Sequence, residues 1–310
     1  MTVLEGRQET RSDEASAPED ATGHEQGPPA QLVDRSIGDL IRELRKLDAR
    51  QVELILQHQR QHGMRFGDAA IALKLASRDD VLWALSQQFH YPYAAEGGLG
   101  GLGGELVTAT DPFSAAAEVF RDVRSQLLMG VLAPDQPRRA LAVLSPNVGD
   151  GKSYFAANLA VVFSQLGEST LLIDGDMRTP RQHKIFGVEP ASGLSNILAG
   201  RAGVDVEQAI SGLPGMHLLT VGTLPPNPLE LMQRASFSFL MQDVLSRFDH
   251  VIVDTPATVR GADSRVLAAR CGAALVIGRR NRTRMDGLHD LVQQIARSHA
   301  KIAGVLLNEH

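Results

Sequence analysis

The sequence predicts an α/β protein with a doubly wound, mostly parallel sheet, preceded by a small helical N-terminal domain. Three observations carry this prediction. Short apolar runs alternate with helical segments from residue 141 onward, which is typical of parallel strands joined by helices. The first run leads through a glycine-bearing turn into an alanine-rich helical pattern, and two later runs end in aspartates. The runs are 141–144, 170–173, 217–221, 251–253, 273–277 and 302–307.

The composition of the chain excludes several classes of protein. With 310 residues, 43% of them hydrophobic, it can build a sizeable core in more than one domain. A net charge of −5 gives no electrostatic case for nucleic-acid binding. The single cysteine, Cys271, fits a buried structural thiol in a cytoplasmic protein. No signal peptide and no apolar stretch near 18 residues is present, so we expect any membrane association to come through a partner.

Three segments are expected before the predicted sheet. Residues 1–30 are rich in Glu, Asp, Ser, Gly and Pro, which indicates a disordered acidic tail. Residues 31–93 contain a repeat, because 36–39 (Ser-Ile-Gly-Asp) recurs 29 positions later as Arg-Phe-Gly-Asp. Each copy has apolar residues at helical spacing and should form a pair of short helices. Residues 94–110, with six glycines between Gly97 and Gly104, are predicted to be a flexible linker.

The second domain is expected to span residues 111–310 and to open with a helix over 114–128. Glu118, Arg121 and Arg124 are spaced three apart and therefore share one face of that helix. The residues by themselves favour a solvated face. Ion pairs within the helix and contact with a neighbouring subunit are the alternatives.

A phosphate-binding loop is predicted after the first apolar run. The run ends in Ser145-Pro146, and Gly149-Asp150-Gly151-Lys152-Ser153 precedes the helical pattern. The glycines let backbone N–H groups approach a polyphosphate, towards which the helix start directs its dipole. Lys152 is expected to bind the β- and γ-phosphates and the Ser153 hydroxyl to bind Mg²⁺. Because Pro146 replaces the first glycine of the usual motif, an ordinary strand-to-helix turn is the alternative.

Three carboxylates follow two of the other apolar runs. Asp174 and Asp176 come after 170–173, and Asp254 comes after 251–253. Carboxylates at strand ends beside a phosphate loop suit a Mg²⁺–nucleotide, since Mg²⁺ binds few protein carboxylates and keeps several waters. We expect Ser153, Asp174 and Asp254 to serve the metal. The expected catalytic residues are Lys152, Asp174 and Asp176. One of the two aspartates would orient or deprotonate the attacking hydroxyl. Aspartates that only cap strand ends are the alternative.

These motifs together resemble those of the bacterial tyrosine kinases of the exopolysaccharide chain-length-determinant type, which have a P-loop MinD/ParA-like fold. The family's Walker A loop corresponds to Gly149–Ser153, its second carboxylate motif to Asp174–Arg178, and its Walker B motif to Asp254-Thr255-Pro256. The family's E-x-x-R-x-x-R helix and its P-P-N-P-x-E-L segment are matched at 118–124 and 225–231.

The resemblance implies ATP and Mg²⁺ as cofactors. It places Gly149, Asp150, Gly151, Lys152, Ser153 and Tyr154 against the nucleotide, with Asn308 reading the adenine. It also implies a homo-oligomer through Glu118, Arg121 and Arg124. An inner-membrane polysaccharide co-polymerase is the implied activator, which would hold the protein at the periphery of the inner membrane.

The repeat of residues 31–93 resembles the N-terminal domain of type II secretion and pilus ATPases, some of which bind cyclic di-GMP. The family motif carries a second glycine seven positions after the first, where this chain has Arg45 and Lys74. The resemblance implies a cyclic di-GMP site. A plain protein-docking helical module is the alternative.

The predicted function is that of an ATP-dependent protein tyrosine kinase or ATPase regulating exopolysaccharide chain length, polymerisation or export. In the family the phosphorylated tyrosines lie in a C-terminal tail, whereas this sequence stops two residues after Asn308. We therefore expect phosphorylation of another protein, or of Tyr91 and Tyr93. The alternatives are a second-messenger-gated switch without catalysis and a partition or division ATPase. Residues 146–148 (Pro-Asn-Val) lack the signature lysine of that last class.

Overall fold

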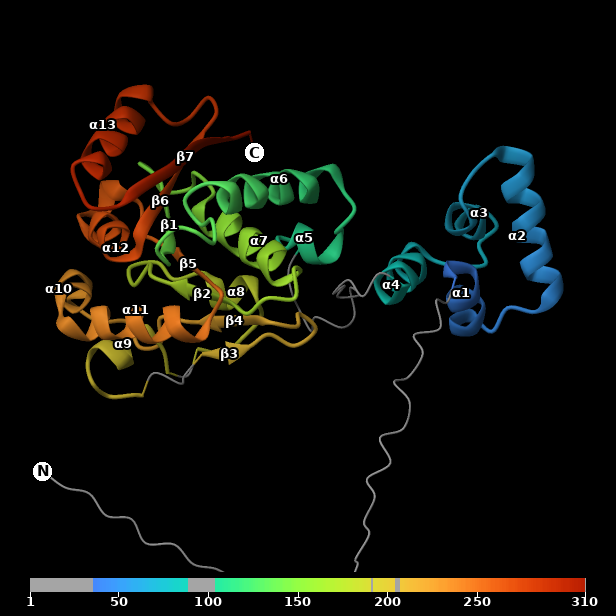
Figure 1. Ribbon diagram of the computed structural model, residues 1–310, viewed down its shortest axis with the longest axis horizontal. Helices are drawn as coiled ribbons and strands as arrows, with labels where there is room; N and C mark the ends of the chain where they lie inside the picture. The colour runs from blue at the N-terminus through green and yellow to red at the C-terminus, as the bar shows by residue number, and fades with distance from the viewer. Residues whose placement is uncertain (1–35, 89–103, 191, 204–206, 310) are drawn as a thin grey trace, which may run out of the picture. The chain divides into compact units, whose positions relative to one another are not determined.

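The computed structural model describes residues 36–88, 104–190, 192–203 and 207–309 (Figure 1). The predicted tail (1–30), Tyr91, Tyr93 and most of the predicted linker lie outside these ranges. Helices of the N-terminal module are α1 (Ile37–Arg45), α2 (Ala49–His62), α3 (Phe66–Ala72) and α4 (Arg78–Gln88). The strands that follow are β1 (Ala140–Leu144), β2 (Thr170–Asp174), β3 (Gln208–Ala209), β4 (Met216–Leu219), β5 (His250–Asp254), β6 (Gly272–Arg279) and β7 (Lys301–Asn308).

The remaining helices alternate with these strands. They are α5 (Val107–Thr110), α6 (Ala115–Met129), α7 (Lys152–Ser164), α8 (Gln182–Ile185), α9 (Leu194–Leu198), α10 (Pro228–Gln233), α11 (Ala235–Arg247), the 3₁₀ turn η1 (Thr258–Arg260), α12 (Asp263–Cys271) and α13 (Met285–Ala296). Each of the six predicted apolar runs coincides with one of the strands from β1 to β7, with ends that differ by at most two residues. Strand β3 is two residues long and was not predicted, because no apolar run corresponds to it.

The N-terminal module consists of the two helix pairs that the repeat predicts. Helices α1 and α3 begin 29 residues apart, at Ile37 and Phe66, and α2 and α4 begin with the same offset. Ser36 accepts a hydrogen bond from the Asp39 N–H at the start of α1, and Asp48 forms a capping box at the start of α2. Apolar side chains from all four helices form a small core of their own.

The sheet has the strand order β3-β4-β2-β5-β1-β6-β7, and every pairing except β3–β4 is parallel. Strand β5 therefore lies between β1 and β2, although it comes almost eighty residues after β2 in the chain. Because all three strands run in the same direction, their carboxyl ends meet at one edge of the sheet. That edge is where the predicted phosphate loop and both carboxylate motifs leave the strands.

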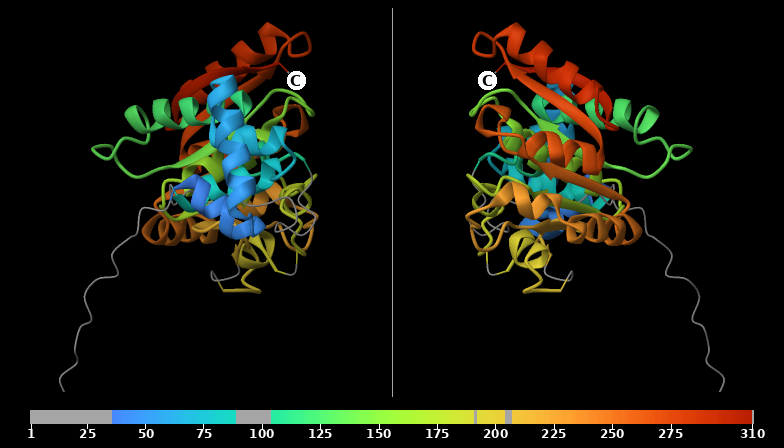
Figure 2. Two further views of the ribbon diagram at one scale, coloured as in Figure 1. Left: turned by 90° about the vertical axis from the view of Figure 1, so that its right-hand side faces the viewer. Right: turned by 90° about the vertical axis from the view of Figure 1, so that its left-hand side faces the viewer.

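Helices cover both faces of the sheet. Alternate residues of β1 point to opposite sides: Leu141 and Val143 join a core with α5 to α8, and Ala140, Ala142 and Leu144 join a core with α9 to α13. In Figure 1, α12 and α13 lie to the left of the strands, and α6 and α7 lie to the right. The edge strand β7 and α13 are the red segments at the top of both views in Figure 2.

The start of the second domain differs from the prediction. The expected linker reached residue 110, but Leu106, Thr108 and Ala109 are fully buried. The backbone N–H and the hydroxyl of Thr108 donate hydrogen bonds to Asn158 of α7, and Leu106 belongs to the core between α6, α7 and the sheet. Apolar side chains in the stretch Leu106 to Ala109 explain this, since burying them outweighs the flexibility that nearby glycines confer. Within the described ranges, no helix is both long and apolar enough to cross a bilayer.

Candidate nucleotide-binding site

The phosphate loop has the backbone conformation that its glycines allow. Gly149 and Gly151 have φ angles of 84° and 100°, in the left-handed region that side chains disfavour. A Cβ atom at Gly151 would come within 2.3 Å of the Asn308 amide nitrogen, so this position also has no room for a side chain. Helix α7 starts at the next residue, Lys152, and turns its first N–H groups towards the loop.

The Lys152 side chain is held inside the loop. It is 7% exposed, and its ammonium group donates a hydrogen bond to Ser145 Oγ at 3.2 Å. Burial lowers the pKa of Lys152, while the charges of Asp254, Asp176 and Asp150 act in the opposite direction. The ammonium group therefore lies among carboxylates, and only a hydroxyl of its own chain is within hydrogen-bond distance among the described residues.

Asp174 and Asp176 organise the segment that follows β2. Asp174 is fully buried, and its two oxygens accept backbone N–H groups of residues 176, 181 and 182 at 3.0–3.2 Å. Burial raises the pKa of Asp174 well above its ordinary value; the neighbouring Asp254 raises it further, and these N–H groups oppose both effects. Asp176 accepts from the N–H groups of Arg178 and Thr179 and from the Thr179 hydroxyl. Arg178 itself pairs with the buried Asp263 of α12.

Asp254 stands beside Asp174 at the end of the adjacent strand, in direct register with it. It is fully buried, and its Oδ2 accepts a hydrogen bond from the Gln182 side chain at 2.8 Å. Its other oxygen, Oδ1, has no hydrogen-bond partner among the described residues. Burial raises the pKa of Asp254, and the neighbouring Ser153 hydroxyl, Lys152 ammonium and Gln182 amide oppose this. Two buried carboxylates thus lie side by side on neighbouring strands, and Lys152 is close to one of them, Asp254.

The outer side of the loop is braced by residues from distant parts of the chain. Asp150 accepts hydrogen bonds from the Asn147 N–H and from the Thr283 hydroxyl, both at 2.9 Å. Arg279 donates to the Gly149 carbonyl at 3.1 Å, and Asn308 donates to the Asp150 carbonyl at the same distance. The Asp150 side chain thus supports the loop from within, which leaves the backbone N–H groups as the part that can face a phosphate.

Tyr154 and the three predicted residues of α6 have partners within the chain. The Tyr154 ring is half-buried and lies edge-on to Phe120 of α6, 6.0 Å away. On α6, Arg121 pairs with Glu118 at 2.7 Å, and Arg124 donates to the Val162 carbonyl in the last turn of α7. Both arginines therefore make contacts inside one chain, whereas Glu118 is largely exposed.

The residues of this edge fit a magnesium–nucleotide complex. Oδ1 of Asp254 is a buried carboxyl oxygen without a hydrogen-bond partner among the described residues, and the Ser153 hydroxyl and the Lys152 ammonium are close to this carboxyl group. A cation shared with phosphate oxygens would satisfy the carboxylate, and Mg²⁺ requires few protein ligands when phosphates and water supply the rest. Asp174 is less suited to direct ligation, because three N–H groups already occupy its oxygens.

Sequence reasoning missed several residues of the site, among them Arg279, which contacts the Gly149 carbonyl. Gln182 contacts Asp254, Thr283 contacts Asp150, and Ser145 contacts Lys152. Ser145 had a local signal, since it lies within the loop. Gln182 and Thr283 had none, because they reach the site through strand order and not through spacing in the chain.

Fold and site together define a P-loop nucleotide-binding protein. Residues 141–310 match the family model of the CobQ/CobB/MinD/ParA nucleotide binding domain. The chain is 31% identical over 205 residues to the tyrosine-protein kinase YwqD of Bacillus subtilis, covering 66% of this chain and 85% of YwqD. A crystal structure of the chimerical protein CapA2B2 superposes with a TM-score of 0.62 at 30% identity, covering 73% of this chain and 97% of that one.

The chain belongs to the bacterial tyrosine-protein kinases, within this nucleotide-binding family. It is also 32% identical over 203 residues to EpsB of Ralstonia solanacearum, which covers 66% of this chain but only 27% of EpsB. Some relatives are thus several times longer than the region that they share with this chain.

Proposed function

We propose that this chain is an ATP-dependent protein tyrosine kinase that regulates the length, polymerisation or export of an exopolysaccharide. The observation that carries the proposal is the buried group at the carboxyl edge of β1, β2 and β5. A lysine and two aspartates there are brought together beside a glycine loop that presents backbone N–H groups. Such an edge has the charges needed to hold a triphosphate with its metal and to neutralise the charge that develops during phosphoryl transfer.

Each residue has a role in this proposal. The backbone N–H groups of the loop and the start of α7 bind the β-phosphate, and the Lys152 ammonium contacts the β- and γ-phosphates. Mg²⁺, when bound, would be held by Ser153 and Asp254 and would neutralise phosphate charge. Asp176, 7% exposed, is our candidate to orient or deprotonate the acceptor hydroxyl. Asp174 assists it by fixing the backbone of residues 176–182.

The activity is tested with the purified full chain, labelled ATP and phosphopeptide mapping. We expect transfer to a tyrosine of another protein or modest labelling at Tyr91 and Tyr93, with slow hydrolysis as background. Tyr154 should remain unlabelled, because its ring packs against Phe120. Hydrolysis without labelling of any protein, even with a membrane activator present, would contradict the kinase proposal and favour a nucleotide switch.

We also propose that the chain forms a homo-oligomer through α6. The exposed side of this helix carries Glu118, 72% exposed, and Val119, 60% exposed. Joint replacement of Glu118, Arg121 and Arg124 by alanine should lower the mass measured by light scattering. Arg124→Ala is the matched control, because its contact with Val162 lies within one chain and its loss should cost stability but leave the assembly intact. Equal masses for the triple variant and the wild type would contradict the proposal.

Two further partners complete the proposal. An inner-membrane polysaccharide co-polymerase is proposed as activator, so that the chain would act in the cytoplasm at the membrane. The helical module is proposed to bind cyclic di-GMP. It contains a cavity of about 380 Å³ lined by both repeats, including Gly38, Arg42, Phe66 and Gln88. Calorimetric titration of the full chain with cyclic di-GMP tests this; no heat at micromolar protein would leave protein docking as the module's function.

A further inference from the structure

Gln182 connects the three nucleotide-site motifs through one side chain and one backbone group. Its Nε2 donates to Asp254 Oδ2 at 2.8 Å and to the Ser153 carbonyl at 3.1 Å. Its backbone N–H donates to Asp174 Oδ2 at 3.0 Å. The residue is the first of α8 and is completely buried. A glutamine without a role in this site would not need to contact the Walker A serine and both carboxylates.

The orientation of the Gln182 amide is determined by its neighbours. Both atoms that face Nε2 are acceptors, a carboxylate oxygen and a carbonyl oxygen, so a reversed amide would place Oε1 against two acceptors. The amide oxygen must therefore point the other way. There it has no hydrogen-bond partner among the described residues.

Two buried oxygens on adjacent side chains are consequently left without hydrogen-bond donors among the described residues. One is Gln182 Oε1 and the other is Asp254 Oδ1, and the two residues are joined by a hydrogen bond. Buried acceptors without donors are rare in folded proteins and call for a group that the protein binds. A water molecule of a magnesium shell has two hydrogens to donate, and Mg²⁺ in nucleotide sites keeps several such waters.

We propose that Gln182 is a positioning residue for the magnesium–nucleotide complex, a proposal that rests on the function proposed above. Its Nε2 fixes Asp254 so that Oδ1 faces the cation, and its Oε1 accepts a hydrogen bond from water bound to that cation. Residues that orient metal ligands in this way typically change metal affinity by about 10- to 100-fold when they are replaced.

The test compares nucleotide binding with and without the metal in the full chain. Dissociation constants of a fluorescent ADP analogue are measured in excess Mg²⁺ and in EDTA for the wild type and for Gln182→Met, which has similar length but no polar group. We expect the tightening caused by Mg²⁺ to fall about tenfold in Gln182→Met, with affinity in EDTA unchanged within about twofold. Electron paramagnetic resonance of Mn²⁺–ADP should show a correspondingly weaker bound complex.

Two further variants make the test specific. Gln165→Met is the matched control, since Gln165 is also buried and its Nε2 bonds the Thr108 carbonyl, away from the site residues described above. It should keep the full Mg²⁺ effect. Gln182→Glu keeps an acceptor oxygen towards the cation but replaces the Nε2 donor by an oxygen that faces Asp254 Oδ2 and the Ser153 carbonyl, so its half-saturating Mg²⁺ concentration should rise, but less than that of Gln182→Met. A rise as large as that of Gln182→Met would overturn the role of Oε1.

The remaining outcomes separate this inference from the proposed function. Equal losses with Mg²⁺ and in EDTA would show that Gln182 only supports the fold, and would overturn the inference. An unchanged Mg²⁺ effect in Gln182→Met would also overturn the role of Gln182. In that case, nucleotide binding by the wild type would still support the proposed nucleotide site. A wild-type chain that binds no nucleotide under either condition would overturn both.

Discussion

The two ends of strand β5 provide opposite environments for similar side chains. At the carboxyl end Asp254 is fully buried, and burial raises its pKa. Asp249, just before the amino end, is exposed, and the hydroxyl and N–H of Ser169 lower its pKa by hydrogen bonding at 2.7 and 2.9 Å. Hydrogen bonds from Ser169 therefore stabilise the charged form of Asp249, whereas burial destabilises the charged form of Asp254.

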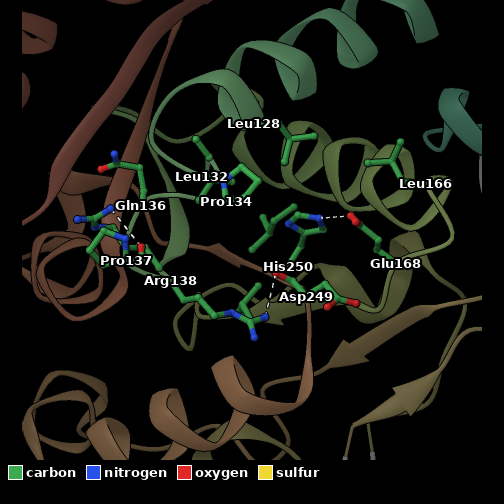
Figure 3. Close-up of a pocket in the computed structure, with 14 residues that line it drawn as sticks. Leu128, Leu132, Pro134, Gln136, Pro137, Arg138, Leu166, Glu168, Asp249 and His250 are labelled. Atoms are coloured by element: carbon green, nitrogen blue, oxygen red, sulfur yellow. Dashed lines mark hydrogen bonds and ion pairs between the residues drawn. The ribbon is translucent and has the colours of Figure 1, made fainter.

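The polar groups around the two ends show the same contrast. The amino end borders a cavity of about 540 Å³, lined by leucines and prolines and shown in Figure 3. Its polar groups are paired: His250 contacts Glu168 at 2.6 Å, and Arg138 donates to the Asp249 carbonyl at 3.3 Å. At the carboxyl end Asp254 Oδ1 and Gln182 Oε1 have no hydrogen-bond partner in the part of the chain that the structure describes. A cavity by itself therefore does not identify a binding site, whereas buried polar atoms without partners among the described residues do indicate one.

The largest expected effect is that of removing the lysine at the carboxyl end. Lys152→Met should weaken ATP binding by about tenfold to several hundredfold, because a charge-assisted contact with phosphate contributes a few kcal/mol. Lys301→Met is the control, since Lys301 is exposed at the amino end of β7 and should not affect binding. Unchanged affinity in a folded Lys152→Met protein would contradict the site assignment.

Replacing Asp176 and replacing Asp254 should affect different steps, phosphoryl transfer in the first case and Mg²⁺-dependent binding in the second. Asp176→Asn keeps the acceptor for the Arg178 and Thr179 N–H groups, so it should reduce phosphoryl transfer about 100-fold or more while ATP binding changes little. Asp254→Ala should instead weaken the dependence on Mg²⁺. Titration calorimetry and single-turnover rates measure the two effects. Asp176→Asn losing affinity as severely as Lys152→Met would show that this division is wrong.

Asp254 should also lower the stability of the nucleotide-free protein at neutral pH. A carboxyl whose pKa is raised by folding stabilises the fold below its unfolded pKa, near pH 4, and this stability is lost as pH rises through the folded pKa. Asp254→Asn should therefore raise Tm by about 2–4 °C at pH 8, with the gain shrinking towards pH 4. Calorimetry across this range measures it. A lower Tm at pH 8 would mean that attraction to Lys152 outweighs the cost of burial.

The smallest effect is expected at the other end of β5, with the opposite pH dependence. The pKa of Asp249 is lowered by folding, so its contribution is present above its unfolded pKa and is lost as pH falls through the folded pKa. Asp249→Asn should cost about 0.5–1 kcal/mol at neutral pH and nothing near pH 2, since the bonds to Ser169 are exposed. Urea denaturation at several pH values checks this. A cost that persists at pH 2 would indicate a packing effect.

Much of the fold was predictable because its signals are local. The apolar runs coincide with strands, and the 29-residue repeat corresponds to two helix pairs. Helix α6 begins at Ala115, one residue after the predicted start, because Ser114 is its N-cap. The phosphate loop was predictable for the same reason, since Gly149 and Gly151 adopt the positive φ angles that glycine favours. The segment 106–110 was mispredicted, because its burial depends on contacts with Asn158 far along the chain.

The sequence by itself determined which residues lie at the ends of strands and how the backbone turns there, because periodicity, glycine and proline act over a few neighbours. The tertiary structure alone decided that β5 lies between β1 and β2, and so placed Asp254 beside Asp174. It also decided that Gln182 contacts both aspartates and that two buried oxygens have no hydrogen-bond partner within the described ranges. These features arise from pairing between distant segments, whose energies depend on burial and distance in space and leave no pattern in the local sequence.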